Sequence, residues 1–115
     1  MKNIRIYELV TMGKGITSEE GQPIYELIHS ALTGGDSVEL DFAGMTFMTT
    51  AFLNIVIGQL YKDFTSEELR ERLIPLNLDK PTSDRIKEVT ANAKLFYANQ
   101  QQFNRNIDEA IYGNQ

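Results

Sequence analysis

The chain between residues 37 and 61 changes from the hydrophobic pattern of a strand to that of a helix. Apolar and acidic side chains alternate first, in the order Val38, Glu39, Leu40, Asp41 and Phe42. This two-residue period predicts a buried strand. After Ala43-Gly44, apolar residues recur at helical spacing, at Leu53, Val56, Ile57 and Leu60. A helix is therefore expected from about Thr50 to Asp63, and Thr49 is placed to cap its start.

Two further strands are indicated on either side of this stretch. Ile4 and Ile6 alternate with polar neighbours, so residues 3–10 are expected to form a first strand. Apolar residues between 72 and 78 predict a third strand. Pro75 lies within it and lacks a backbone N–H, so this strand is expected at a sheet edge or with a break.

An amphipathic helix is predicted over residues 19–33. Thr17 and Glu20 have the spacing of a capping box at its start. Its expected core-facing side chains are Ile24, Leu27, Ile28 and Ala31. Gly34-Gly35 follow directly and are expected to end it.

The last third of the chain has a regular apolar pattern that predicts a long helix from Pro81. The stripe consists of Ile86, Val89, Ala93, Phe96, Phe103, Ile107 and Ala110. A continuous helix from 81 to 110 would span about 45 Å, more than a compact domain of this size. Either the chain bends near 99–104 and folds back, or the stripe projects and pairs with a second copy. In a homodimer, which we favour, Gln100 would set the register.

Composition agrees with one domain over residues 1–115. We expect an α/β fold with a small mixed sheet of about four strands, packed helices and a C-terminal helical extension over 97–115. The chain is 42% hydrophobic and contains no cysteine, which excludes disulfides and thiol catalysis. No signal-peptide-like or membrane-spanning apolar run stands out, so a cytoplasmic location is expected.

The charge distribution disfavours nucleic acid and membrane partners. The net charge is −5, and no lysine or arginine occurs from Gly15 to Tyr61. Such a surface repels phosphate backbones and anionic lipids. A protein that docks there is expected to be basic. A solvated acidic surface without a partner explains the same pattern equally well.

Complete catalytic motifs are missing from the sequence. Gly13-Lys14-Gly15 resembles part of a phosphate-binding loop, but Glu8 and Gly15 stand where the pattern requires glycine and Ser or Thr. A hairpin turn is favoured. His29 is the only histidine, so it is expected to be a partly exposed helix residue rather than a zinc ligand or a member of a relay. The sequence predicts no enzyme, no cofactor and no metal site.

Three residues remain as candidates for a site. Asp41 ends the central strand, where open α/β sheets bind ligands, so it would orient a hydroxyl, bind a metal or serve the structure alone. Thr49 and Thr50 are ordinary helix-capping residues in one interpretation. In the other, one of them is a phosphoacceptor, and its phosphate changes a docking surface.

Residues 38–61 resemble the central block of STAS domains, the fold of anti-sigma-factor antagonists. They are most similar to a bacterial STAS-like family of unknown function. The likeness rests on a strand that ends in Asp41-Phe42, on the Thr49-Thr50 turn and on the pair Phe52-Leu53. It extends over roughly residues 1–97.

The resemblance implies partner switching. In the antagonists, a partner kinase phosphorylates a serine or threonine at this helix start, and the phosphate changes binding. The implied partner is an anti-sigma factor or a histidine-kinase-like ATPase. The antagonist motif is Asp-Ser-Ser-Gly, with the second serine as the usual acceptor. Here Ala51 stands at that position and Phe52 replaces the glycine. Thr50, ahead of Thr49, is therefore the candidate phosphoacceptor.

The leading interpretation is a non-enzymatic regulatory module that binds a protein through the helix Thr49–Tyr61. Asp41, Phe52 and Asn54 are its candidate partner- or ligand-binding residues, with Phe52 either buried or part of a contact surface. The alternative is a small-molecule or nucleotide sensor with a pocket between Asp41 and Thr50. Exposed apolar side chains near the helix would favour the module, and convergent polar groups in a pocket would favour the sensor.

Overall fold

The computed structural model describes the backbone of residues 1–108 and the side chains of residues 1–98. The elements in chain order are β1 (Lys2–Arg5), the 3-10 helix η1 (Ile6–Leu9), β2 (Lys14–Gly15), α1 (Ser18–Thr33), β3 (Val38–Asp41), β4 (Phe47–Met48), α2 (Thr50–Val56), the 3-10 helix η2 (Gly58–Lys62), α3 (Ser66–Arg72), β5 (Leu73–Leu76) and α4 (Lys80–Asp108). This mixture of strands and helices confirms the predicted α/β class.

The strands form two parallel sheets rather than one mixed sheet. β1, β3 and β5 form a three-stranded sheet in that order, and β2 pairs with β4. Val38 lies opposite Lys2 on one side and Leu73 on the other. Parallel strands require long crossover connections, which α1 supplies between β1 and β3. β5 is an edge strand, as Pro75 predicted.

Both ends of α1 follow the sequence signals. The Thr17 hydroxyl accepts from the Glu20 N–H at 3.1 Å, and the Glu20 carboxylate accepts from the Thr17 N–H at 3.0 Å. The helix ends at Gly34, whose N–H donates to the Ser30 carbonyl. Leu27 was predicted to face the core, but it is 48% exposed, so the buried face is narrower than expected.

Two predicted elements are shorter than the sequence indicated. The first strand ends at Arg5, because the chain then turns into η1 and slips out of strand alternation. The helix expected from Thr50 to Asp63 divides into α2 and η2. Gly58 lies at this division, with α4 side chains close to it: an added Cβ would stand 3.6 Å from Val89.

The core lies between the sheet and the helices and is centred on α2. Its largest fully buried side chain is Phe52, with Ile6, Ile24, Ile28 and Leu40 also fully buried. Gly15 passes directly over the Phe52 ring, and a Cβ there would stand 2.5 Å from a ring carbon. Glycine at position 15 is therefore a packing requirement of the core rather than a phosphate-loop feature.

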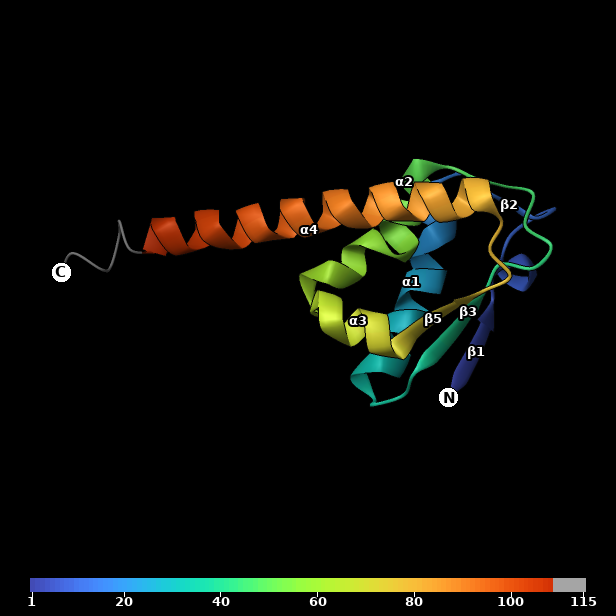
Figure 1. Ribbon diagram of the computed structural model, residues 1–115, viewed down its shortest axis with the longest axis horizontal. Coiled ribbons are helices and arrows are strands. Elements are labelled where there is room, and N and C mark those ends of the chain that lie inside the picture. Colours follow the sequence, from blue (N-terminus) through green and yellow to red (C-terminus); the bar gives the residue numbers. More distant parts are fainter. Residues whose placement is uncertain (109–115) are drawn as a thin grey trace.

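The helix α4 is continuous through residues 99–106, a segment rich in asparagine and glutamine. It crosses α2 and then extends beyond the rest of the molecule (Figure 1). With this helix included, the molecule measures 57 × 27 × 23 Å. Of the two alternatives for the last helix, the bend near 99–104 is therefore wrong, because the backbone remains helical to Asp108. Ala110 lies outside the described residues, as do the side chains of Gln100, Phe103 and Ile107. Pairing with a second copy remains a prediction.

The predicted stripe of α4 is buried only in part. Val89 and Ala93 are buried against the rest of the domain, and Ile86 is half-buried. Phe96 is 60% exposed, because the helix leaves the domain at that point. No helix among residues 1–108 combines the length and apolar character needed to cross a lipid bilayer.

Candidate functional site

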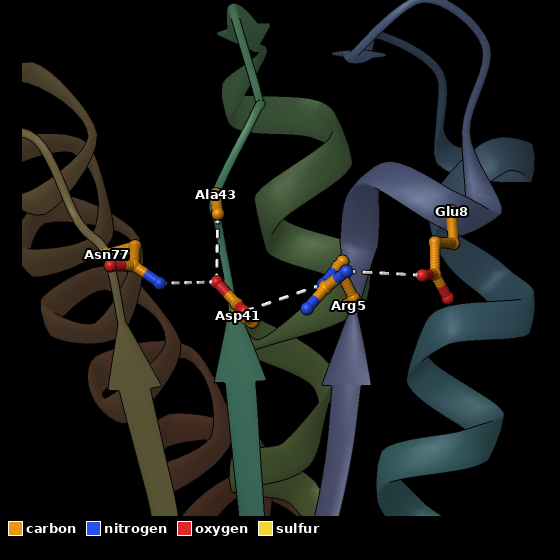
Figure 2. Close-up of polar contacts among 5 residues, drawn as sticks. All are labelled: Arg5, Glu8, Asp41, Ala43 and Asn77. Atoms are coloured by element: carbon orange, nitrogen blue, oxygen red, sulfur yellow. Dashed lines mark hydrogen bonds and ion pairs between the residues drawn. The ribbon is translucent and has the colours of Figure 1, made fainter.

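The carboxylate of Asp41 lies at the carboxyl end of β3 and is held from three directions (Figure 2). Its Oδ1 accepts from the Ala43 N–H at 2.9 Å and from the Asn77 side-chain amide at 2.8 Å. Its Oδ2 lies 3.7 Å from Nε of Arg5, which also reaches Glu8. Asp41 is buried, and these contacts join β1, β3 and the loop after β5.

These contacts favour the ionised form of Asp41. The hydrogen bond from Asn77 lowers the pKa of Asp41, and the Ala43 N–H and the Arg5 guanidinium act in the same direction against desolvation. Asn77 itself has φ +58, a left-handed conformation that asparagine tolerates better than most residues. The geometry therefore gives Asp41 a structural role at the end of the sheet.

Thr49 and Thr50 have different surroundings. The Thr49 hydroxyl accepts from the Phe52 N–H at 3.1 Å and donates to the Ile16 carbonyl at 2.6 Å, so it is the N-cap of α2. Thr50 is exposed, and its hydroxyl makes no hydrogen bond with the part of the chain whose side chains are described. Thr50 is the more accessible hydroxyl of the two.

Arg85 was missed by the sequence interpretation and lies close to this helix start. Its Nη1 donates to the Met48 carbonyl at 2.7 Å, one residue before Thr49. Its guanidinium lies 5.4 Å from the centroid of the exposed Phe47 ring. Arg85 thus connects the first turns of α4 with the loop that leads into α2.

The remaining candidates separate into one core residue and one surface residue. Phe52 was expected to be either buried or part of a contact surface. It is fully buried and therefore belongs to the core. Asn54 is exposed and lines a cavity of about 340 Å³ between α2 and α4. We name this feature the α2–α4 groove, and its other walls include Gln59, Asn92, Phe96 and Tyr97.

The α2–α4 groove combines exposed aromatic rings with amide side chains. The Phe96 and Tyr97 rings meet edge to face with centroids 4.9 Å apart. Gln59 Oε1 is buried and has no hydrogen-bond partner among the described side chains and backbone. The apolar stripe of the last helix included Phe96. The sequence pattern could not show that Phe96 lies where α4 leaves the domain, so that its ring is exposed.

His29 is a partly exposed helix residue, as predicted. Its Nε2 lies 2.8 Å from Asp63 Oδ2, and its ring contacts those of Tyr25 and Phe64. Within residues 1–98 no group of three or more metal-ligating side chains comes together. The five main cavities of the described chain include neither Asp41 nor Thr50 in their walls.

The parallel sheet, the crossover helix α1 and the short capped helix α2 define an α/β domain of STAS-like form. Residues 20–83 match a protein-family model described as STAS-like domain of unknown function (DUF4325). Because this segment is more than half of the chain, the protein belongs to that family. The match confirms the resemblance inferred from the sequence. Comparisons with curated proteins and with solved structures gave no match.

Proposed function

We propose that this chain is a non-enzymatic regulatory module that binds a protein partner on the exposed face of α2 and the adjoining part of α4. The observation that carries the proposal is the α2–α4 groove. The other face of α2 packs into the core through the buried side chains of Phe52, Leu53 and Val56. The exposed face is therefore free to contact another molecule.

The chemistry of this face is that of a protein interface. Asn54 and Asn92 supply polar groups, and Phe96 presents a large apolar ring that is 60% exposed. Leu95, 65% exposed, adds apolar surface on α4. Aromatic rings surrounded by polar groups are typical of the centre of an interface, where a few residues contribute most of the affinity.

The partner is expected to be basic in the part that contacts the acidic half of the domain. No lysine or arginine lies between Gly15 and Tyr61, so electrostatic attraction there favours positive charge. The family likeness suggests an anti-sigma factor or a histidine-kinase-like ATPase. Thr50 lies on the same exposed face, and a phosphate on it would add about −1.5 to −2 charges. Phosphorylation would thus switch the affinity for one partner against another.

Site-specific crosslinking in the native host tests the docking face. A photoreactive amino acid at Asn54 is expected to capture one specific protein, whereas the same group at Gln22, exposed on α1, is expected to capture none. The Phe96→Ala substitution should abolish the product at position 54. An identical set of products from both positions would contradict docking on α2.

Mass spectrometry of protein from the native host tests the switch. Phosphate is expected on Thr50, because the Thr49 hydroxyl is already bonded to Ile16 and Phe52. The matched control is the Thr50→Ala variant, which should lack the modified peptide. Phosphate confined to Ser18, Ser37 or Thr65 would contradict partner switching at this helix.

A further inference from the structure

A second cavity of about 270 Å³ lies on the other side of α4, between that helix, α3, η2 and the sheet. Its walls are mainly apolar. Leu40, Phe42, Ile57 and Leu69 are buried side chains of the core that also border it. The rest of the apolar lining is Leu73, Pro75 and Ile86. The cavity does not share residues with the α2–α4 groove.

The cavity arises from the way the last elements pack. α4 packs closely on η2 and α2, whereas α3 packs on the edge strand β5. A space therefore remains where α4 passes over β5 and α3. Small-molecule sites in proteins are concave, mostly apolar and supplied with a few polar groups that orient the ligand. A cavity of this size is suited to a small ligand rather than to a nucleotide.

The polar side chains that border this cavity are two cations, Arg70 and Lys94, and three hydroxyl groups, with no carboxylate among them. The hydroxyl groups belong to Tyr61, Ser66 and Thr90. Lys94 Nζ lies 5.9 Å from the centroid of the Tyr61 ring. Burial raises the pKa of Tyr61, and the positive charge of Arg70, which borders the same cavity, opposes this rise. Neither cation forms an ion pair with a described carboxylate.

We propose that this cavity binds a small amphipathic anion, with an apolar body against Leu69 and Ile86 and a carboxylate or phosphate head between Arg70 and Lys94. In a chain of net charge −5, two cations without carboxylate partners at one apolar cavity give it a local charge complementary to such a head. The Tyr61 hydroxyl is available as a third hydrogen-bond donor. This site shares no lining residue with the α2–α4 groove.

Binding would connect α3 and α4. Lys94 belongs to α4 and Arg70 to α3, so one anionic head that contacts both would hold these helices together. α4 also supplies Phe96 and Tyr97 to the α2–α4 groove. A ligand in the cavity would therefore stabilise the helix that forms part of the docking face.

Calorimetric titration of the full-length protein with three compounds of equal chain length tests the proposal. Decanoate and decyl phosphate are the anionic probes, and decanol is the neutral match. At least one anion is expected to bind with 1:1 stoichiometry and about tenfold or more tightly than decanol, since hydrogen bonds to charged groups are stronger than neutral ones. The tighter of the two anions identifies the preferred head.

Variants separate the head from the apolar body. Arg70→Gln with Lys94→Gln should lower the affinity for the anion to that for decanol, and Thr90→Phe should weaken both by filling the cavity. Lys87→Gln, which removes an exposed α4 cation outside the cavity, should change neither. Equal affinity for the anions and decanol, or an equal loss of anion affinity in the Lys87→Gln variant and in the double variant, would overturn the proposal. So would a dimer that Thr90→Phe converts to monomers, because a second copy would then occupy the cavity.

Discussion

The carboxyl end of the sheet and the flanks of α4 differ in how far the domain itself buries and bonds their side chains. At the sheet end, Asp41 is buried and bonded to Asn77 and Ala43, and the Thr49 hydroxyl is fully used. Along α4, Phe96 is exposed and Lys94 has no carboxylate partner among the described residues. The side chains at the sheet end therefore join neighbouring strands, whereas those on the flanks of α4 are the ones that we propose to bind other molecules.

The difference shows that the place of a polar residue in a fold does not by itself assign a function. A carboxylate at the end of a parallel strand is often a ligand-binding group. Here Oδ1 of Asp41 accepts two hydrogen bonds, Oδ2 lies 3.7 Å from Arg5, and the side chain is buried, so the carboxylate contributes to the structure of the sheet end. Unsatisfied groups beside exposed apolar surface are more informative, because folding alone does not account for them.

Alanine substitutions at Phe52 and Phe96 should give the largest difference in stability between the core and the flank of α4. Phe52→Ala removes a fully buried ring and is expected to lower the free energy of unfolding by about 3–5 kcal/mol. Phe96→Ala removes an exposed ring and should change it by less than about 0.5 kcal/mol. Urea denaturation of both variants measures the contrast. A comparable loss for Phe96→Ala would mean that Phe96 belongs to the core.

Adding one methyl group over Phe52 should have the next largest effect. Gly15→Ala places its Cβ against the Phe52 ring and is expected to cost about 1–3 kcal/mol of stability through overpacking. Gly34→Ala is the matched control, because its Cβ would meet only backbone oxygens at ordinary contact distance and its φ is −77. Equal thermal unfolding midpoints for the two variants would contradict the close packing of β2 on α2.

The stability contributed by Asp41 should depend on pH. Its pKa is lowered on folding from an ordinary value of 3.8, so its contribution is present above pH 3.8 and is lost as the pH falls through the folded pKa. Asp41→Asn should therefore reduce the loss of stability below pH 3.8. Glu20 and Asp79 also have lowered pKa values, so the Asp41→Asn variant should still lose some stability as the pH falls. Thermal unfolding of wild type and Asp41→Asn between pH 2 and 7 measures how stability depends on pH. The same pH dependence in both proteins would contradict the structural role of Asp41.

Removing the end of α4 should leave the stability of the domain almost unchanged while altering its assembly. The full-length chain is expected to be a dimer through the projecting helix, and a version that ends at Ala98 is expected to be a monomer. Light scattering on both proteins decides between these states. Two monomers would exclude pairing through this helix.

Sequence signals succeeded where they were local. The capping pair Thr17 and Glu20, the edge position implied by Pro75 and the capping role of Thr49 all depend on neighbours in the chain. The signals failed where distant segments decide. The exposure of Leu27 depends on what packs on α1, and one hydrogen-bond partner of Asp41 is Asn77, a residue 36 positions away.

The surfaces on the two flanks of α4 could not be predicted from the sequence, because they too depend on segments that are distant in the chain. A regular apolar stripe predicts a buried face wherever it runs, but Phe96 lies where the supporting domain ends. Arg70 and Lys94 come from separate helices, and only the packing of α3 on β5 and α4 on η2 brings them to one cavity. No motif marks such a pair in the sequence.

Partner affinity at unchanged stability tests most directly whether α2 and α4 together form a docking face. The protein captured at position 54 would be titrated with wild type, Asn54→Arg, Phe96→Ala and the α1 control Gln22→Arg. We predict at least about tenfold weaker binding for the first two variants, as expected of central interface residues, with unfolding midpoints like that of wild type. Unchanged affinity for Asn54→Arg and Phe96→Ala, together with a loss for Gln22→Arg, would contradict the account.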